Sequence, residues 1–148
     1  DLAIRLFQED HGRRVVLKCH PMMPFDEFAN LLDIQLPKHV EVSNESITQL
    51  MGTSAVLVYS ASSVGVQALA LGLPAVHLRT QFEFNMDPLE GIPEARLEAT
   101  GLEDLREKVR WLLEHGEEYI AQHRDQWNWL VEDIYGPVTE ETIRAFVE

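Results

Sequence analysis

The chain has 148 residues, of which 45% are hydrophobic and 25% charged, a composition typical of one folded domain and unlike that of disordered or collagen-like chains. The formal net charge is −13, and residues 75–148 hold 17 of the 25 acidic side chains. This excess of acid excludes binding to bulk nucleic acid as a main function, because such binding needs a basic surface that neutralises phosphates.

The sequence also indicates where the chain works. No apolar run approaches the ~18 residues that span a bilayer, and residues 1–14 lack the basic and then apolar pattern of a secretory signal. Cys19 is the single cysteine, which excludes an internal disulfide and a zinc site made of cysteines. We therefore expect a soluble chain in the reducing cytoplasm.

Short β-branched apolar runs alternate with helical patterns over residues 1–100, and this alternation is typical of βαβ units and a parallel sheet. In chain order, the predicted strands are Val15–Cys19, Val40–Val42, Ala55–Tyr59, Ala75–Leu78 and a short edge strand, Ala95–Ala99. The fold class predicted for residues 1–148 is α/β, a single domain with a Rossmann-like parallel sheet of about four to six strands flanked by helices.

The segments between these strands have helical spacing. Apolar residues predict one helix from Phe25 to Leu32, a second around Ile47, Leu50 and Met51, and a third over Val64–Leu71. The third helix is expected to end at Gly72, where a helix C-terminus favours a left-handed residue, and Pro74 prevents its continuation.

Residues 101–148 form a long acidic segment for which we predict helices only. Thr100 and Glu103 have the spacing of a capping box at its start. One apolar stripe precedes Gly116 and a second follows it, and Thr139 is expected to cap a terminal helix. The stripes and the apolar residues of the terminal helix are Leu102, Leu105, Val109, Leu112 and Leu113; Trp127, Leu130, Val131 and Ile134; and Ile143, Phe146 and Val147.

Ligands of open parallel α/β sheets bind beyond the C-terminal ends of the strands, where loops lead into helix N-termini. This rule converts the strand prediction into a site prediction, because the residues at or just past the ends of the first four predicted strands are mostly polar. They are Lys18, His20 and Pro21; Ser43 and Asn44; Ser60, Ser62 and Ser63; and Arg79. Such groups suit an anion and a sugar.

The junction from Tyr59 to Gly65 is the most informative, because small hydroxyl residues and a glycine open a helix. Backbone N–H groups and hydroxyls at such a turn can hold a phosphate without a lysine. The alternative is that Ser62 or Ser63 is an ordinary N-cap. The segment is neither a Walker loop nor a Gly-x-Gly-x-x-Gly fingerprint, which disfavours kinase-like and ordinary NAD-dependent enzymes.

The histidines differ in what their positions predict. His20 stands at the end of a strand, where an imidazole could donate to a phosphate or ribose, and the alternative is a hydrogen-bonded structural residue. His77 alternates within a strand and is expected to be a packing residue. No histidine has metal-ligand spacing, so no metal site is predicted.

The stretches 16–21 and 55–76 place strand, His-Pro, strand, Ser-Ser, helix, Gly-x-Pro and strand in one order. In this order the chain resembles the C-terminal, donor-binding half of a GT-B glycosyltransferase. Within that superfamily, His-Pro followed by Ser-Ser resembles bacterial enzymes that build capsular or lipopolysaccharide sugars from CMP-activated donors. The resemblance implies that His20 contacts the nucleotide and that Ser62 and Ser63 hold its phosphate.

The predicted nucleotide- and phosphate-binding residues are His20, Pro21, Ser60, Ser62, Ser63, Gly65 and Gln67, with Lys18, Ser43, Asn44 and Arg79 as further donor contacts. Gln67 departs from the family, because many enzymes that use UDP- or GDP-sugars have a glutamate there that holds the ribose. An amide accepts through only one oxygen, which disfavours those two donors. The nucleotide sugar would be the substrate, and no cofactor is implied.

The resemblance further implies an acceptor-binding N-terminal domain, outside this chain, that supplies the catalytic base. The chain alone, with residues 1–100 as the nucleotide-binding core and 101–148 as C-terminal helices, would be an inactive part of a cytoplasmic enzyme. The whole enzyme would associate peripherally with the inner face of the plasma membrane.

Two alternatives remain. One is a non-hydrolysing UDP-sugar 2-epimerase domain, which Gln67 disfavours. The other is a non-catalytic α/β binding module; its receiver-type form would need acidic residues where His20 and Ser60 stand.

Overall fold

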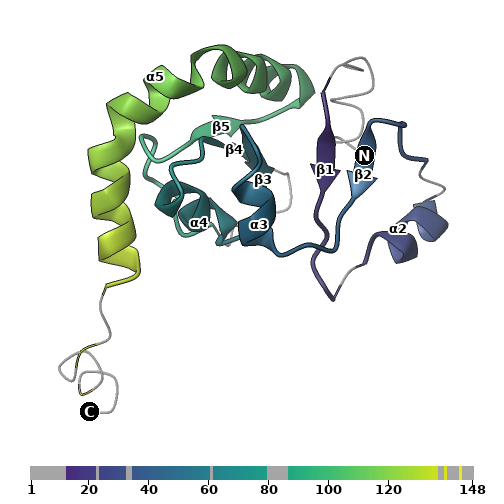
Figure 1. Ribbon diagram of the computed structural model, residues 1–148, viewed down its shortest axis with the longest axis horizontal. Helices are drawn as coiled ribbons and strands as arrows, with labels where there is room; N and C mark the ends of the chain where they lie inside the picture. The colour runs from purple at the N-terminus through teal and green to yellow at the C-terminus, as the bar shows by residue number, and fades with distance from the viewer. Residues whose placement is uncertain are drawn as a thin grey trace.

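The computed structural model describes residues 13–22, 24–32, 35–60, 62–79, 87–136, 139 and 144. Within them, short strands alternate with helices, and one long helix follows (Figure 1). In chain order the elements are β1 (Val15–Leu17), α2 (Phe25–Leu32), β2 (Val40–Val42), α3 (Ile47–Met51), β3 (Leu57–Tyr59), α4 (Val64–Ala70), β4 (Ala75–Leu78), β5 (Leu97–Ala99) and α5 (Leu102–Ile134).

All described strands pair in parallel, as the βαβ pattern predicts, but they form two sheets. β1 pairs with β2, and a second sheet has the order β3, β4, β5. The α/β class is confirmed, whereas the single sheet of four to six strands is not found among the described residues. The strands of the two sheets also differ in burial. β4 of the three-stranded sheet is buried throughout, whereas β1 is only half-buried and β2 exposes two of its three residues.

The predicted element bounds agree closely with the structure. β2 and β4 span the predicted residues, and β1, β3 and β5 are each two residues shorter than predicted. Because β1 ends at Leu17, Cys19 lies just beyond the strand and not within it, and the residue is half-buried. The apolar pattern therefore locates every described strand, but it places the ends of three of them two residues too far.

The end of α4 follows the sequence rule for helix C-termini. Gly72 has φ +66, and its N–H donates to Leu69 O at 3.0 Å, while Leu73 N–H donates to Ala68 O at 2.8 Å. These two bonds form a Schellman motif, which satisfies carbonyls at the helix end and needs a left-handed residue. Pro74 follows, and the chain then enters β4.

α5 is one continuous helix that carries both predicted apolar stripes, the one before and the one after Gly116. Gly116 lies against the loop after α4, since a Cβ built there would come 3.9 Å from Pro74 Cγ. Figure 1 shows α5 starting beside β5, crossing the three-stranded sheet and then turning down along the side that carries α4. Because it packs against this loop and the sheet, α5 stays helical at Gly116, although glycine is a weak helix former.

The predicted capping box of Thr100 and Glu103 is wrong. Gly101 occupies the N-cap position, and Thr100 N–H instead donates to Asp104 Oδ2 at 2.9 Å. The hydrogen bond from Lys108 and that from the Thr100 backbone lower the pKa of Asp104. The carboxylate one residue beyond Glu103 thus holds the helix start. The predicted terminal helix after Thr139 lies outside the described residues.

The main hydrophobic core lies between the three-stranded sheet and α5. Its buried members come from α4, β4, β5, the segment before β5, and α5, and include Val66, Val76, Leu89, Leu105 and Trp127. A smaller cluster joins Met51 of α3 to the β3 and α4 region. No described helix combines the length and apolarity that crossing a bilayer requires.

Candidate functional site

The candidate residues after β1 and β2 lie at one end of the two-stranded sheet. Lys18 Nζ donates to Ser43 O at 3.5 Å, which links the two strand ends. Pro21 and Asn44 are exposed. None of the hydrogen bonds of Lys18, His20, Ser43 and Asn44 reaches the three-stranded sheet within the described residues.

His20 is exposed and has a defined orientation. Its Nδ1 accepts a hydrogen bond of 3.2 Å from Met22 N–H. A neutral imidazole that accepts through Nδ1 carries its proton on Nε2. The outward nitrogen is therefore a donor, which suits contact with a phosphate or ribose oxygen.

The serine turn, defined here as Ser60, Ser62 and Ser63, connects β3 to α4. Ser62 Oγ accepts a hydrogen bond of 3.3 Å from Val64 N–H, a local contact at the helix start. Ser63 is the N-cap, but its side chain is exposed and makes no capping hydrogen bond. Of the two serines, Ser62 is thus the one whose hydroxyl accepts a backbone hydrogen bond at the helix start. The Ser63 hydroxyl makes no such bond.

Gly65 and Gln67 lie in the first turns of α4. Gln67 is half-buried, whereas Gly65 is buried against a tyrosine. A Cβ built at Gly65 would lie 2.3 Å from the Tyr59 hydroxyl oxygen and 2.6 Å from Tyr59 Cζ. A glycine is therefore required at this position by packing, whether or not a ligand approaches it.

Gly65→Ala is expected to destabilise the protein by about 1–3 kcal/mol, the usual effect of forcing an extra methyl group into a packed site. Urea denaturation followed by circular dichroism measures the change. Gly52→Ala is the matched control, because Gly52 has φ −64 and its Cβ would make only ordinary contacts at 3.5 Å or more. Equal effects at the two glycines would contradict the tight packing at Gly65.

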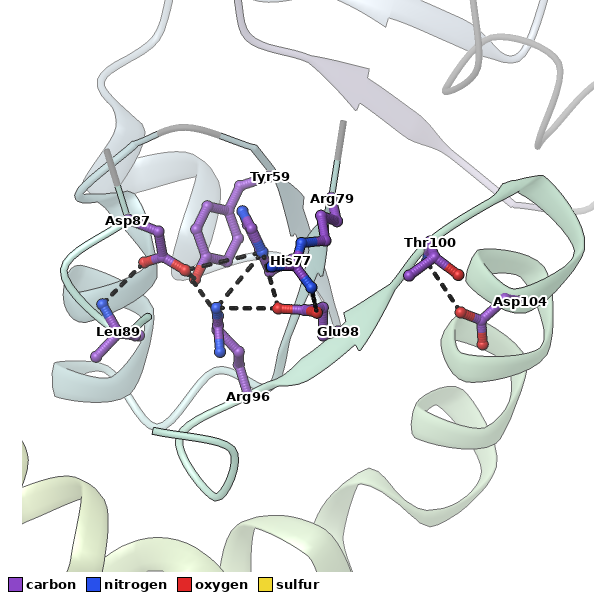
Figure 2. Close-up of polar contacts among 9 residues, drawn as sticks. All are labelled: Tyr59, His77, Arg79, Asp87, Leu89, Arg96, Glu98, Thr100 and Asp104. Atoms are coloured by element: carbon purple, nitrogen blue, oxygen red, sulfur yellow. Dashed lines mark hydrogen bonds and ion pairs between the residues drawn. The ribbon is translucent and has the colours of Figure 1, made fainter. Parts of the chain in front are cut away.

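A buried polar cluster, which sequence reasoning did not identify as a unit, joins side chains of β3, β4 and β5 to the segment that precedes β5 (Figure 2). We define it as Tyr59, His77, Asp87, Arg96 and Glu98. Asp87 Oδ2 accepts from Tyr59 Oη at 2.9 Å and from Arg96 Nε at 2.7 Å, and Asp87 Oδ1 accepts from Leu89 N–H at 3.1 Å. The Asp87 and Arg96 side chains are 0% and 3% exposed, so the ion pair is inside the protein.

The strand register explains how three members of the cluster meet. Tyr59 is paired with His77 across β3 and β4, and His77 is paired with Glu98 across β4 and β5. Residues in register on neighbouring strands place their side chains on the same face. The Tyr59 and His77 rings accordingly have centroids 5.2 Å apart.

The electrostatics of the cluster fix its donors and acceptors. Burial, followed by the negative charge of Asp87 and the hydrogen bond to it, raises the pKa of the Tyr59 hydroxyl. The hydroxyl therefore stays protonated and donates to Asp87. Arg96 Nη2 lies 3.4 Å from His77 Nδ1, and because a guanidinium can only donate, this histidine nitrogen is the acceptor.

Arg79 connects the cluster to the surface. It follows β4 directly, its side chain is 59% exposed, and its Nη1 donates to Glu98 Oε1 at 3.2 Å. The other oxygen of Glu98 lies 3.5 Å from Arg96 Nη2 and 3.7 Å from His77 Nδ1. Glu98 thus bridges the exposed Arg79 guanidinium and the buried Arg96 guanidinium.

The predicted site residues therefore fall into two groups. Lys18, His20, Pro21, Ser43 and Asn44 belong to the two-stranded sheet, while the serine turn, Gly65, Gln67 and Arg79 belong to the three-stranded sheet. No group of histidine, cysteine or carboxylate side chains within the described residues is arranged to hold a metal ion.

The buried polar cluster left one signal in the sequence. His77 is a polar residue inside an apolar strand and is buried, as its position predicts. Asp87 and Arg96 carried no such signal, because they stand among many other charged residues of an acidic region.

Comparisons of the chain with protein-family models, with curated proteins and with solved structures return no match.

Proposed function

We propose that the chain is the donor-nucleotide-binding half of a GT-B glycosyltransferase that uses a CMP-activated sugar in bacterial surface-polysaccharide synthesis. In this proposal the two parallel sheets belong to one Rossmann-like domain. The observation that carries the proposal is the serine turn. It follows a parallel strand directly, opens α4, and leaves the Ser63 hydroxyl exposed without a capping hydrogen bond.

Arg79 supports the same proposal from the neighbouring strand. Because Tyr59 pairs with His77, the residues after β3 and after β4 leave the same edge of the sheet. An exposed guanidinium thus follows the strand next to the one that the serine turn follows, and both kinds of group donate hydrogen bonds to anions. This combination suits a phosphate held without a metal ion.

The chemistry follows from where charge develops. When the bond between the sugar and the phosphate breaks, negative charge grows on the departing nucleotide phosphate. The Ser63 hydroxyl, the first amides of α4 and the Arg79 guanidinium would stabilise that charge more strongly in the transition state than in the ground state. His20, with its proton on Nε2, would contact the nucleotide, and the catalytic base would come from the acceptor-binding half.

A thermal-shift comparison of CMP, CDP, UMP, UDP and GDP, with and without Mg²⁺, tests the proposal. A nucleotide at ~100 times its dissociation constant stabilises a protein by about 2.7 kcal/mol, which corresponds to roughly 5–10 °C for a domain of this size. We expect a selective response to CMP that does not need Mg²⁺. A selective response to UDP or GDP would contradict the donor choice, and the absence of any response would contradict the proposed function.

Ser63→Ala sharpens this test. Its side chain makes no capping hydrogen bond, so we expect an unfolding free energy within about 0.5 kcal/mol of the wild type. A hydroxyl bound to a charged phosphate contributes about 1.5–3 kcal/mol, so CMP affinity should fall at least tenfold.

Ser46→Ala is the matched control, because Ser46 caps α3 in a full capping box with Gln49. It should lose about 1 kcal/mol of stability and keep its CMP affinity. The same affinity loss in both variants would remove the role given to Ser63.

A further inference from the structure

Tyr59 contacts two segments that are separate in the sequence. Its ring fills the space beside Gly65 in the first turn of α4, which leaves no room for a side chain there. Its hydroxyl donates to Asp87, in the segment that precedes β5. One side chain at the end of β3 therefore connects the start of α4 with residues 87–96 (Figure 2).

Asp87 holds the tyrosine hydroxyl at a fixed point. The carboxylate is fully buried, and it also accepts from Arg96 and from Leu89 N–H. A carboxylate held by a buried guanidinium and a backbone amide has little freedom to move, so the hydroxyl that it accepts is fixed as well. The ring then sets how closely α4 approaches the end of β3.

We propose that Tyr59 is a positioning residue, whose hydrogen bond to Asp87 fixes the serine turn and the first turn of α4 in the geometry that binds a nucleotide phosphate. The nucleotide part of this inference rests on the proposed function. The positioning part rests on the contacts of Tyr59 alone. Glu98 of the same cluster, which lies 3.5 Å from Arg96 Nη2, also accepts a hydrogen bond from Arg79, so the cluster contacts both candidate phosphate-binding segments of the three-stranded sheet.

Tyr59→Phe isolates the hydroxyl, because phenylalanine keeps the ring beside Gly65 and removes only the bond to Asp87. Tyr119→Phe is the matched control. Tyr119 is buried to the same degree, 5% against 7% exposed, and burial raises the pKa of both hydroxyls, but Tyr119 lies in α5. Both variants remove one phenolic oxygen from a buried tyrosine of the same fold.

Two readouts decide the question at a temperature where both variants are folded. The first is amide hydrogen exchange by NMR, which compares Val64, Gly65 and Val66 with the amides of α5. Tyr59→Phe should speed exchange in α4 about tenfold relative to α5, the upper range for one lost hydrogen bond, and Tyr119→Phe should not. The second is CMP titration, in which Tyr59→Phe should raise the Kd about tenfold and Tyr119→Phe should leave it unchanged.

The two readouts separate the possible failures. Exchange that rises equally in α4 and α5 would show only a loss of global stability and would overturn the positioning role. Local exchange with an unchanged Kd for CMP would overturn its link to the nucleotide. A wild-type protein that binds none of the nucleotides would count against the proposed function, and the exchange data alone would then decide whether Tyr59 positions the turn.

Discussion

Asp87→Ala should lower the free energy of unfolding by about 3–5 kcal/mol, the usual effect of removing one partner from a buried ion pair. The substitution leaves the Arg96 guanidinium, 3% exposed, with Glu98 at 3.5 Å as its remaining carboxylate. It also removes the acceptor of the Tyr59 hydroxyl and of Leu89 N–H. Urea denaturation followed by far-ultraviolet circular dichroism measures the loss.

Glu41→Ala is the surface counterpart of this variant. It removes the ion pair between Arg14 and Glu41, whose side chains are largely exposed, and should change stability by less than about 1 kcal/mol. The double variant Asp87→Leu with Arg96→Met removes both charges and should recover much of the loss. If Asp87→Ala and Glu41→Ala had equal effects, the buried pair would contribute no more than a surface pair.

Trp127→Ala should cost about 3–5 kcal/mol, the range for truncating a large buried aromatic residue. Its side chain is 1% exposed and packs edge-on against Tyr119, with ring centroids 5.7 Å apart. Its indole N–H donates to Glu94 O at 3.4 Å. The residue therefore fixes the second half of α5 to the segment before β5, and the substitution leaves a cavity at that contact.

Trp129→Ala provides the control for residue type, because Trp129 is two positions further along α5 and 61% exposed. It should change stability by no more than about 0.5 kcal/mol. Circular dichroism is the suitable probe for both variants, since each removes a fluorophore. Comparable losses in the two variants would mean that the burial of Trp127 does not carry the stability assigned to it.

Local features of this fold could be predicted from the sequence because their causes are local. The left-handed Gly72 followed by Pro74 ends α4 as expected, and the apolar runs mark β2 and β4 at their observed bounds. Periodicity identifies a strand but not its neighbours, so the division into two sheets was not predicted. The packing of Gly116 against Pro74 was not predicted for the same reason, since it depends on the tertiary structure.

The serine turn could be predicted because its cause is local, whereas the buried polar cluster depends on contacts between distant residues. Seven consecutive positions, 59 to 65, were sufficient to predict a turn that opens a helix. The cluster required knowledge of register and of a contact between Tyr59 and Asp87, which lie 28 residues apart. Polar residues that pair over such separations are indistinguishable in the sequence from solvated ones, and only the buried position of His77 gave any indication.

The hydrophobic clusters are distributed unevenly, and this has a consequence for binding. The described members of both clusters come from residues 47–131, and β1, α2 and β2 supply none of them. The two-stranded sheet should therefore open locally at a lower free energy than the rest of the fold. A nucleotide that contacted both His20 and Ser63 would have to order the less stable two-stranded sheet relative to the three-stranded sheet. The conformational entropy lost in this ordering would lower the apparent affinity for the nucleotide.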